Sequence, residues 1–110
     1  MIAPLVLVAV AVVAPARVQV TAQEFSLTLS RPSVKAGPAI IELANFGEDT
    51  HDLRIKQIGV ARAKTFGVAA LAPGETGDVE RKLVAGRYQL WCSIADHRAR
   101  GMRAVLRVTK

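Results

Sequence analysis

Three residues with metal-binding side chains stand at even intervals near the end of the chain. In the stretch YQLWCSIADHRARGM, Cys92 is followed five positions later by His97, and Met102 comes after five more. Thiolates and thioethers are soft ligands and imidazole is borderline, so this combination suits copper in both of its oxidation states. The chain has only two histidines, so the remaining nitrogen donor would be the other one, His51.

The four side chains together favour copper over other metals. Two imidazoles and a thiolate with a weak axial methionine are typical of a blue-copper electron-transfer site. Zinc is the main competitor, but it prefers four strong ligands and gains little from a thioether. Iron–sulfur clusters need more thiolates than one cysteine supplies. Each residue alone also has an ordinary explanation: Cys92 and Met102 as core side chains, and His51 as a turn residue.

The first sixteen residues, MIAPLVLVAVAVVAPA, carry no charge. This run is shorter than the roughly 20 apolar residues of a membrane-spanning helix, and it ends in the small-x-small form of a signal-peptidase site. The run contains no Lys or Arg before Arg17, which departs from the positively charged start of a signal peptide. We predict a secretory signal over residues 1–16, with an uncleaved anchor and a buried strand as alternatives, and one domain over residues 17–110. A metal-bound thiolate would explain an unpaired cysteine in an exported domain.

The charge balance is basic and predicts acidic partners. Fifteen Lys and Arg against nine Asp and Glu give a net charge of +6, and ten of the cations are arginine. Nucleic acid is disfavoured, because the chain has only five aromatic residues and no known nucleic-acid-reading motif. Arg98 and Arg100 flank His97. They are either part of a solvated charged surface or, as our functional hypothesis, they steer an acidic redox partner toward an exposed edge of His97.

The hydropathy pattern after residue 16 is typical of short strands. VQVTAQEFSLTLS alternates with Phe25, Leu27 and Leu29 on one face, and AIIELANF, HDLRI and the segments after residue 75 follow between turn signals. Period-two alternation with turns at roughly ten-residue intervals predicts an all-β, antiparallel Greek-key sandwich or barrel. The stretch over residues 56–72 is less clear and fits an irregular crossover, a short helix or two edge strands.

Alternation also positions the candidate ligands. Cys92 shares its parity with Leu90, so it ends one strand pointing inward, and Met102 shares its parity with Leu106 and begins the next strand pointing inward. His97 lies in the middle of the connection. His51 begins another strand, at the end of a sandwich where loops gather. The pattern therefore predicts that the four side chains meet at one end of the fold.

The sequence resembles the cupredoxins, small plastocyanin-like blue-copper proteins, and the spacing is most similar to the bacterial single-domain kind. The resemblance rests on NFGEDTHDL, LAPGETGDVERKLVAGRYQLWCSIADH and RGMRAVLRV, which with the first strand cover most of residues 18–109. It implies that one copper ion, cycling between Cu(II) and Cu(I), is bound by four ligands, namely His51, Cys92, His97 and Met102.

The resemblance further implies roles for Asn45 and Asp52, as residues that hydrogen-bond near the ligands. The implied protein is a monomeric electron carrier of the periplasm or the extracellular space, not an enzyme, and membrane association stays open. The chain departs from many relatives in having Ala95-Asp96 where they have Pro-Gly before the second histidine. It also lacks the disulfide of azurins and phytocyanins, since it has one cysteine.

Three other functions fit parts of the pattern. A copper carrier or chaperone on the same fold would use an open, exchangeable site, although such proteins use several methionines and this chain has two. A thiol hydrolase would use Cys92 with a histidine and an aspartate, but no oxyanion-donor motif is visible. The third is a metal-free interaction domain on a cupredoxin scaffold.

Overall fold

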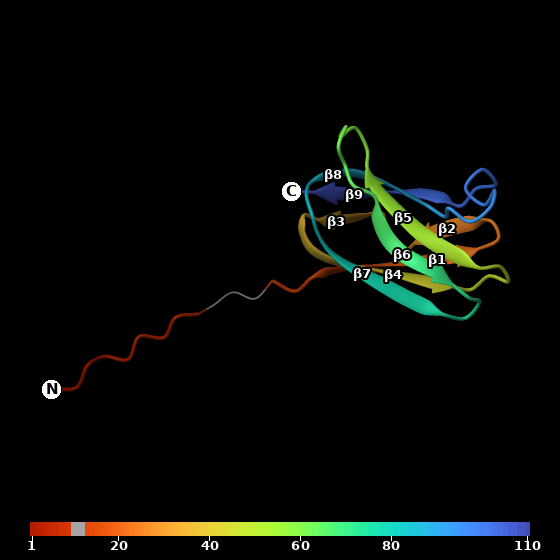
Figure 1. Cartoon of the computed structure of the whole chain (residues 1–110). Coiled ribbons are helices and arrows are strands. Elements are labelled where there is room, and N and C mark those ends of the chain that lie inside the picture. The colour runs from red at the N-terminus through yellow and green to blue at the C-terminus, as the bar shows by residue number, and fades with distance from the viewer. Residues whose placement is uncertain (10–12) are drawn as a thin grey trace.

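The computed structural model describes residues 1–9 and 13–110, and within these ranges the chain forms nine strands and no helix (Figure 1). The strands, in chain order, are β1 (Ala16–Gln23), β2 (Ser26–Leu29), β3 (Ser33–Lys35), β4 (Gly37–Asn45), β5 (His51–Gln57), β6 (Phe66–Leu71), β7 (Thr76–Leu83), β8 (Gly86–Trp91) and β9 (Arg103–Thr109).

The strands form two sheets that pack face to face. One sheet has the order β2-β1-β4-β7 and the other β3-β9-β8-β5-β6. Most neighbours are antiparallel, but β1 pairs with β4 and β3 with β9 in parallel. A parallel pair needs a crossover connection, and here the chain passes to the other sheet between the two partners. The predicted all-β sandwich is confirmed, with these two parallel pairs added.

The core lies between the sheets and follows the alternation of the strands. Its fully buried side chains come from both layers and include Val20, Ile41, Leu43, Leu53, Ile55, Leu90 and Leu106. Full burial of one such side chain is worth about 1.5–3 kcal/mol. The predicted inward parity is confirmed on both strands that flank the ligand loop, because Tyr88, Leu90, Leu106 and Val108 are all buried.

The first predicted strand is in fact a hairpin. The prediction took VQVTAQEFSLTLS as one alternating segment, whereas β1 ends at Gln23 and β2 begins at Ser26, with Gln23 paired to Ser26. The buried positions of β1 have even numbers, but Leu27 in β2 has an odd one. A single strand cannot change parity without a bulge, so this shift marks the turn at Glu24 and Phe25.

The unclear middle stretch, residues 56–72, contains the end of β5, a loop over residues 58–65 and one edge strand, β6. Of the three alternatives, the short helix is wrong and the edge strand is correct for the second half of the stretch.

At the N-terminus, residues 1–9 and 13–15 are exposed and belong to no strand. Residues 10–12 of the predicted signal lie outside the described residues. No helix in the described ranges is long and apolar enough to cross a bilayer.

Leu90 gives a direct test of the packing that supports the ligand loop. It is fully buried two residues before Cys92, so Leu90→Ala should lower the free energy of unfolding by about 2–5 kcal/mol through lost burial and a residual cavity. Val105 on the neighbouring strand is 45% exposed, and Val105→Ala should change it by less than about 0.5 kcal/mol. Urea denaturation of the metal-free protein measures both; equal losses would contradict this description of the core.

Candidate metal centre

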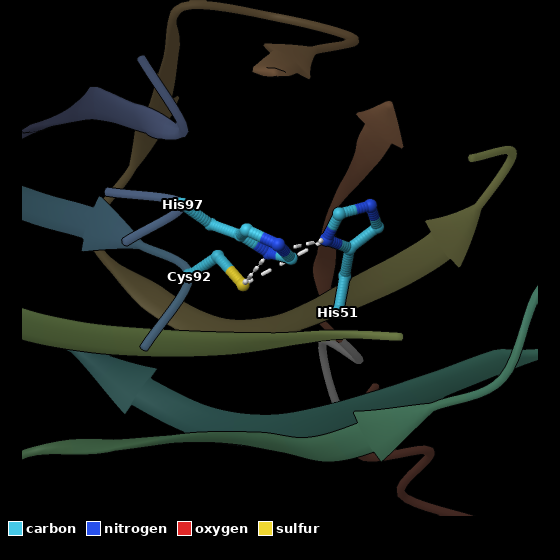
Figure 2. Close-up of side chains that lie close together, drawn as sticks. All are labelled: His51, Cys92 and His97. Carbon is cyan, nitrogen blue, oxygen red and sulfur yellow. Dashed lines mark hydrogen bonds between the residues drawn. The ribbon is translucent and has the colours of Figure 1, made fainter. Parts of the chain in front are cut away.

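Three candidate ligands converge at one end of the sandwich (Figure 2). Cys92 Sγ lies 3.6 Å from His97 Nδ1 and 3.8 Å from His51 Nδ1, and the two nitrogens are 3.2 Å apart. The relative exposure of these residues is 0% for Cys92 and His51 and 6% for His97. One ion could therefore contact all three donor atoms with only small side-chain shifts.

The loop between β8 and β9 presents Cys92, His97 and Met102. The Cys92 N–H donates to the Met102 carbonyl at 3.1 Å, which extends the β8–β9 ladder by one pair. The Met102 N–H donates to the His97 carbonyl, also at 3.1 Å. Met102 is fully buried, and β9 begins one residue after it, at Arg103, rather than at Met102 as predicted. The backbone thus ties Met102 to both neighbouring candidate ligands.

Asn45 shapes the turn that leads to His51. Its side-chain NH2 donates to the carbonyls of Asp49 and Leu71, at 2.8 and 3.0 Å, and its Oδ1 accepts from the Gly47 N–H at 2.8 Å. Asn45 is 1% exposed, so these bonds satisfy a buried amide. It acts on the backbone before His51 and has no hydrogen bond to a candidate ligand.

Asp52 joins the two chain segments that carry His51 and Cys92. Its carboxylate accepts the Ser93 N–H at 2.7 Å and also the Ser93 hydroxyl. Asp52 follows His51 directly and Ser93 follows Cys92 directly, so this contact holds the two strand ends together.

Burial raises the pKa of the Cys92 thiol, so a metal ion that binds here must displace the thiol proton.

Glu24, in the β1–β2 turn, is a residue that the sequence reasoning missed. Its Oε1 lies 2.9 Å from His51 Nε2. The same carboxylate accepts the N–H groups of Glu48 and Asp49, with the shortest distance 2.6 Å. These backbone hydrogen bonds, followed by the contact with His51, lower the pKa of Glu24 from its ordinary value of 4.5 to about 2. Glu24 is therefore an ionised acceptor for His51 at neutral pH.

His97 also lies beside a carboxylate. Contrary to our prediction, His97 does not present an exposed edge, because it is buried. Its Nε2 lies 3.4 Å from Asp49 Oδ2, and the Phe25 ring packs beside it with 5.3 Å between centroids. The Arg100 guanidinium stacks on the Phe25 ring, with its carbon 4.1 Å from the ring centre. The β1–β2 turn thus covers the side of His97 that the sequence analysis left open to solvent.

Glu24 orients the His51 imidazole through a hydrogen bond to Nε2, whereas Asp49 lies 3.4 Å from His97 Nε2 without a hydrogen bond to it. A carboxylate that accepts the Nε2–H group selects the tautomer whose Nδ1 carries a lone pair. Both Nδ1 atoms face Cys92 Sγ. Two imidazole nitrogens and one thiol sulfur in a buried site fit a soft or borderline transition metal.

The predicted docking residues lie on different surfaces. Arg98 stacks on Trp91, with 4.6 Å from its guanidinium carbon to the ring centre, whereas Arg100 stacks on Phe25 beside His97. Both arginines are exposed. They therefore flank His97 in sequence but extend from the ligand loop toward different neighbours.

Comparison with solved structures establishes the fold. The chain superposes on a reduced auracyanin from the photosynthetic bacterium Roseiflexus castenholzii with a TM-score of 0.70 and 16% identity, over 88% of this chain and 99% of that one. Auracyanin A of Chloroflexus aurantiacus, described as a blue copper protein, gives 0.65 and 12%, over 87% and 100%. The chain has the cupredoxin fold, as the sequence resemblance predicted.

A copper enzyme shares this fold in one part of its chain. The copper-containing nitrite reductase of Thermus scotoductus superposes with a TM-score of 0.62 and 16% identity, over 88% of this chain but 32% of the enzyme. No protein-family model and no curated protein sequence matches this chain. The fold alone therefore does not separate an electron carrier from an enzyme domain, whereas the buried ligand set bears on function directly.

The lowered pKa of Glu24 predicts an acid-dependent contribution to stability. Because its pKa falls from 4.5 to about 2 on folding, its stabilisation is fully present above pH 4.5 and is lost as the pH falls toward 2. Between pH about 6 and about 3, the unfolding free energy of the metal-free protein should therefore fall less in Glu24→Gln than in the wild type. The matched control is Glu80→Gln on exposed β7, which should keep the wild-type slope; identical slopes in all three proteins would refute the prediction.

Proposed function

We propose that this chain is a type 1 copper protein that carries one electron at a time between redox proteins outside the cytoplasm. The observation that carries the proposal is the approach of two imidazole nitrogens and one thiol sulfur to within 4 Å of one another in a buried site. When bound, copper supplies the one-electron change between Cu(II) and Cu(I). In this proposal His51 and His97 bind through Nδ1 and Cys92 through Sγ.

Met102 is the proposed weak axial ligand. It is fully buried, and its backbone bonds to both Cys92 and His97 place it beside them. A long contact to a thioether is typical of blue-copper sites.

The surrounding contacts support electron transfer because they fix the ligands. Glu24 holds the outer nitrogen of His51 by a hydrogen bond, Asp49 lies beside that of His97, and Asp52 holds the strand ends together through Ser93. A site whose ligands are held by the protein changes little between the two oxidation states, so little reorganisation accompanies each transfer. Asn45 contributes by fixing the turn before His51.

Burial of the ligands favours an electron carrier over the alternative functions. A thiol hydrolase needs an accessible nucleophile, whereas Cys92 has 0% exposure. A copper carrier or chaperone needs ligands that exchange readily, and here all three donors are enclosed.

The proposed partners are redox proteins with acidic surfaces, because the chain carries a net charge of +6. The proposed setting is the periplasm or extracellular space, and the proposed state is a monomer.

Copper binding itself is the first test. Purified protein given one equivalent of Cu(II) should turn intensely blue, because the colour of such sites comes from the copper–thiolate bond. Cys92→Ser should remove the colour while the circular dichroism of the metal-free protein stays unchanged. A colourless copper complex would favour the copper-handling alternative, and no copper binding at all would refute the proposal.

Met102→Leu tests the axial ligand. This volume-conserving change removes one sulfur donor. In the wild type that donor stabilises the more positive Cu(II) more than Cu(I), so its loss destabilises Cu(II). The protein should stay blue, and its reduction potential should rise by at least ~59 mV, a tenfold change in a one-electron equilibrium. Leu106→Met is the control, since it makes the reverse change at another fully buried position, in β9. An unchanged potential in Met102→Leu would show that Met102 only fills space.

A further inference from the structure

Charged side chains are distributed unevenly between the two sheets. The strands of sheet β3-β9-β8-β5-β6 contain one carboxylate, Asp52, which is engaged by Ser93. They contain six cations, which are Lys35, Arg54, Lys56, Arg87, Arg103 and Arg107. In β4 and β7 of the other sheet, by contrast, Glu42, Asp78 and Glu80 accompany Arg81 and Lys82.

The cations of β5, β8 and β9 lie together on the outer surface of their sheet. The strand register places Arg54 opposite Trp91, and Trp91 opposite Arg103. Their neighbours Leu53 and Leu90 point into the core, so these three side chains point outward. We call the outer surface formed by Arg54, Lys56, Arg87, Trp91, Arg98, Arg103 and Arg107 the basic face.

Among the described residues, no Lys or Arg of the basic face forms an ion pair with a carboxylate. Both ion pairs found in the described part of the protein involve a histidine, and neither involves Lys or Arg. Arg87 lies directly opposite Arg107 in the β8–β9 ladder. Like charges in this position destabilise a sheet, so an anionic partner would relieve a repulsion that the isolated protein retains.

Two hollows open on this surface. The larger, of about 700 Å³, is lined by Lys56, Trp91 and Arg98 together with small and apolar residues of the β5–β6 loop. The smaller, of about 360 Å³, lies at Arg87, Val105 and Arg107. Neither is lined by Asp or Glu. Cation-lined hollows, the larger of them beside Trp91, fit protruding acidic side chains of a folded protein better than the surface of a lipid bilayer.

We propose that the basic face is the docking surface for an acidic redox protein. The proposal rests on the electron-carrier function and moves the docking site from the end of the ligand loop to the sheet. Arg98 belongs to this surface through its stacking on Trp91, and Arg100 does not, because it stacks on Phe25 beside His97. Trp91 directly precedes Cys92, so a partner docked here lies against the strand that presents the thiolate.

Charge reversal with matched controls tests the location. The probe is a small acidic c-type cytochrome, and stopped-flow absorbance measures its reduction by the copper-loaded protein. Arg54→Glu/Arg103→Glu should lower the second-order rate constant by at least ~10-fold at low salt, where steering is strongest. Arg17→Glu/Lys82→Glu changes the net charge equally on the other sheet and should lower it by less than ~3-fold. Raising the ionic strength should remove the difference between the two variants.

Two single variants separate the basic face from the loop end. Arg103→Glu should lower the rate constant more than Arg100→Glu does. Equal effects of the two double variants, or a larger effect of Arg100→Glu, would overturn the proposal. It would also be overturned if the wild type bound phosphatidylglycerol vesicles through Arg54 and Arg103 while the cytochrome rate stayed unchanged in the double variant.

A measurement without copper separates this proposal from the proposed function. The paramagnetic anion hexacyanochromate(III), added to the metal-free ¹⁵N-labelled protein, should broaden amide signals of β8 and β9 around Arg87, Trp91 and Arg103 first. Arg54→Glu/Arg103→Glu should reduce this broadening, and Arg17→Glu/Lys82→Glu should not. Broadening centred on residues 97–101 instead would contradict the basic face even if copper bound as proposed.

Discussion

The structure depends on holding two imidazole nitrogens and one sulfur together in a buried site. The three donors come from segments about forty residues apart in the chain, and their burial removes solvent as a hydrogen-bonding partner. The molecule meets this constraint by giving each imidazole a carboxylate on its far side, from Glu24 and Asp49. In the described part of the chain every buried side-chain nitrogen and oxygen has a hydrogen-bond partner. The donor atoms are therefore directed inward by protein contacts alone.

This arrangement divides the charge of the molecule by location. Acidic groups gather where the ligand-bearing turns meet, and among them Glu24 and Asp52 are used for hydrogen bonds to the neighbouring turns and strands. The arginines of β5, β8 and β9 lie on the outer side of the sheet that carries Cys92. The negative charge orients the ligands, and the positive charge stays free for contacts with other molecules, so the two tasks do not compete for the same side chains.

Much of the fold and of the candidate centre could be predicted from the sequence. Strand parity placed Cys92 and Met102 inward, and the approach of His51 to Cys92 followed from its position at a strand end. Glu24 could not be found in this way, because its role depends on a turn that was hidden inside an apparently continuous strand. The low exposure of His97 was missed for the same reason, since Phe25 lies in that turn. Contacts between distant turns require the pairing of the sheets, which local periodicity does not contain.

The loop from Cys92 to Met102 closes most of its backbone hydrogen bonds within itself, because the N–H groups of His97, Arg100 and Gly101 donate to the carbonyls of Ile94, Asp96 and Arg98. Its tightest external requirement is at Gly101, where an added Cβ would lie 2.8 Å from the Phe25 carbonyl oxygen and the φ angle is +128°. The conformation of this loop therefore depends mainly on its own backbone hydrogen bonds and on the two strands that anchor it. The geometry of the centre is thus set locally, by a short segment, and the two sheets supply its anchor points.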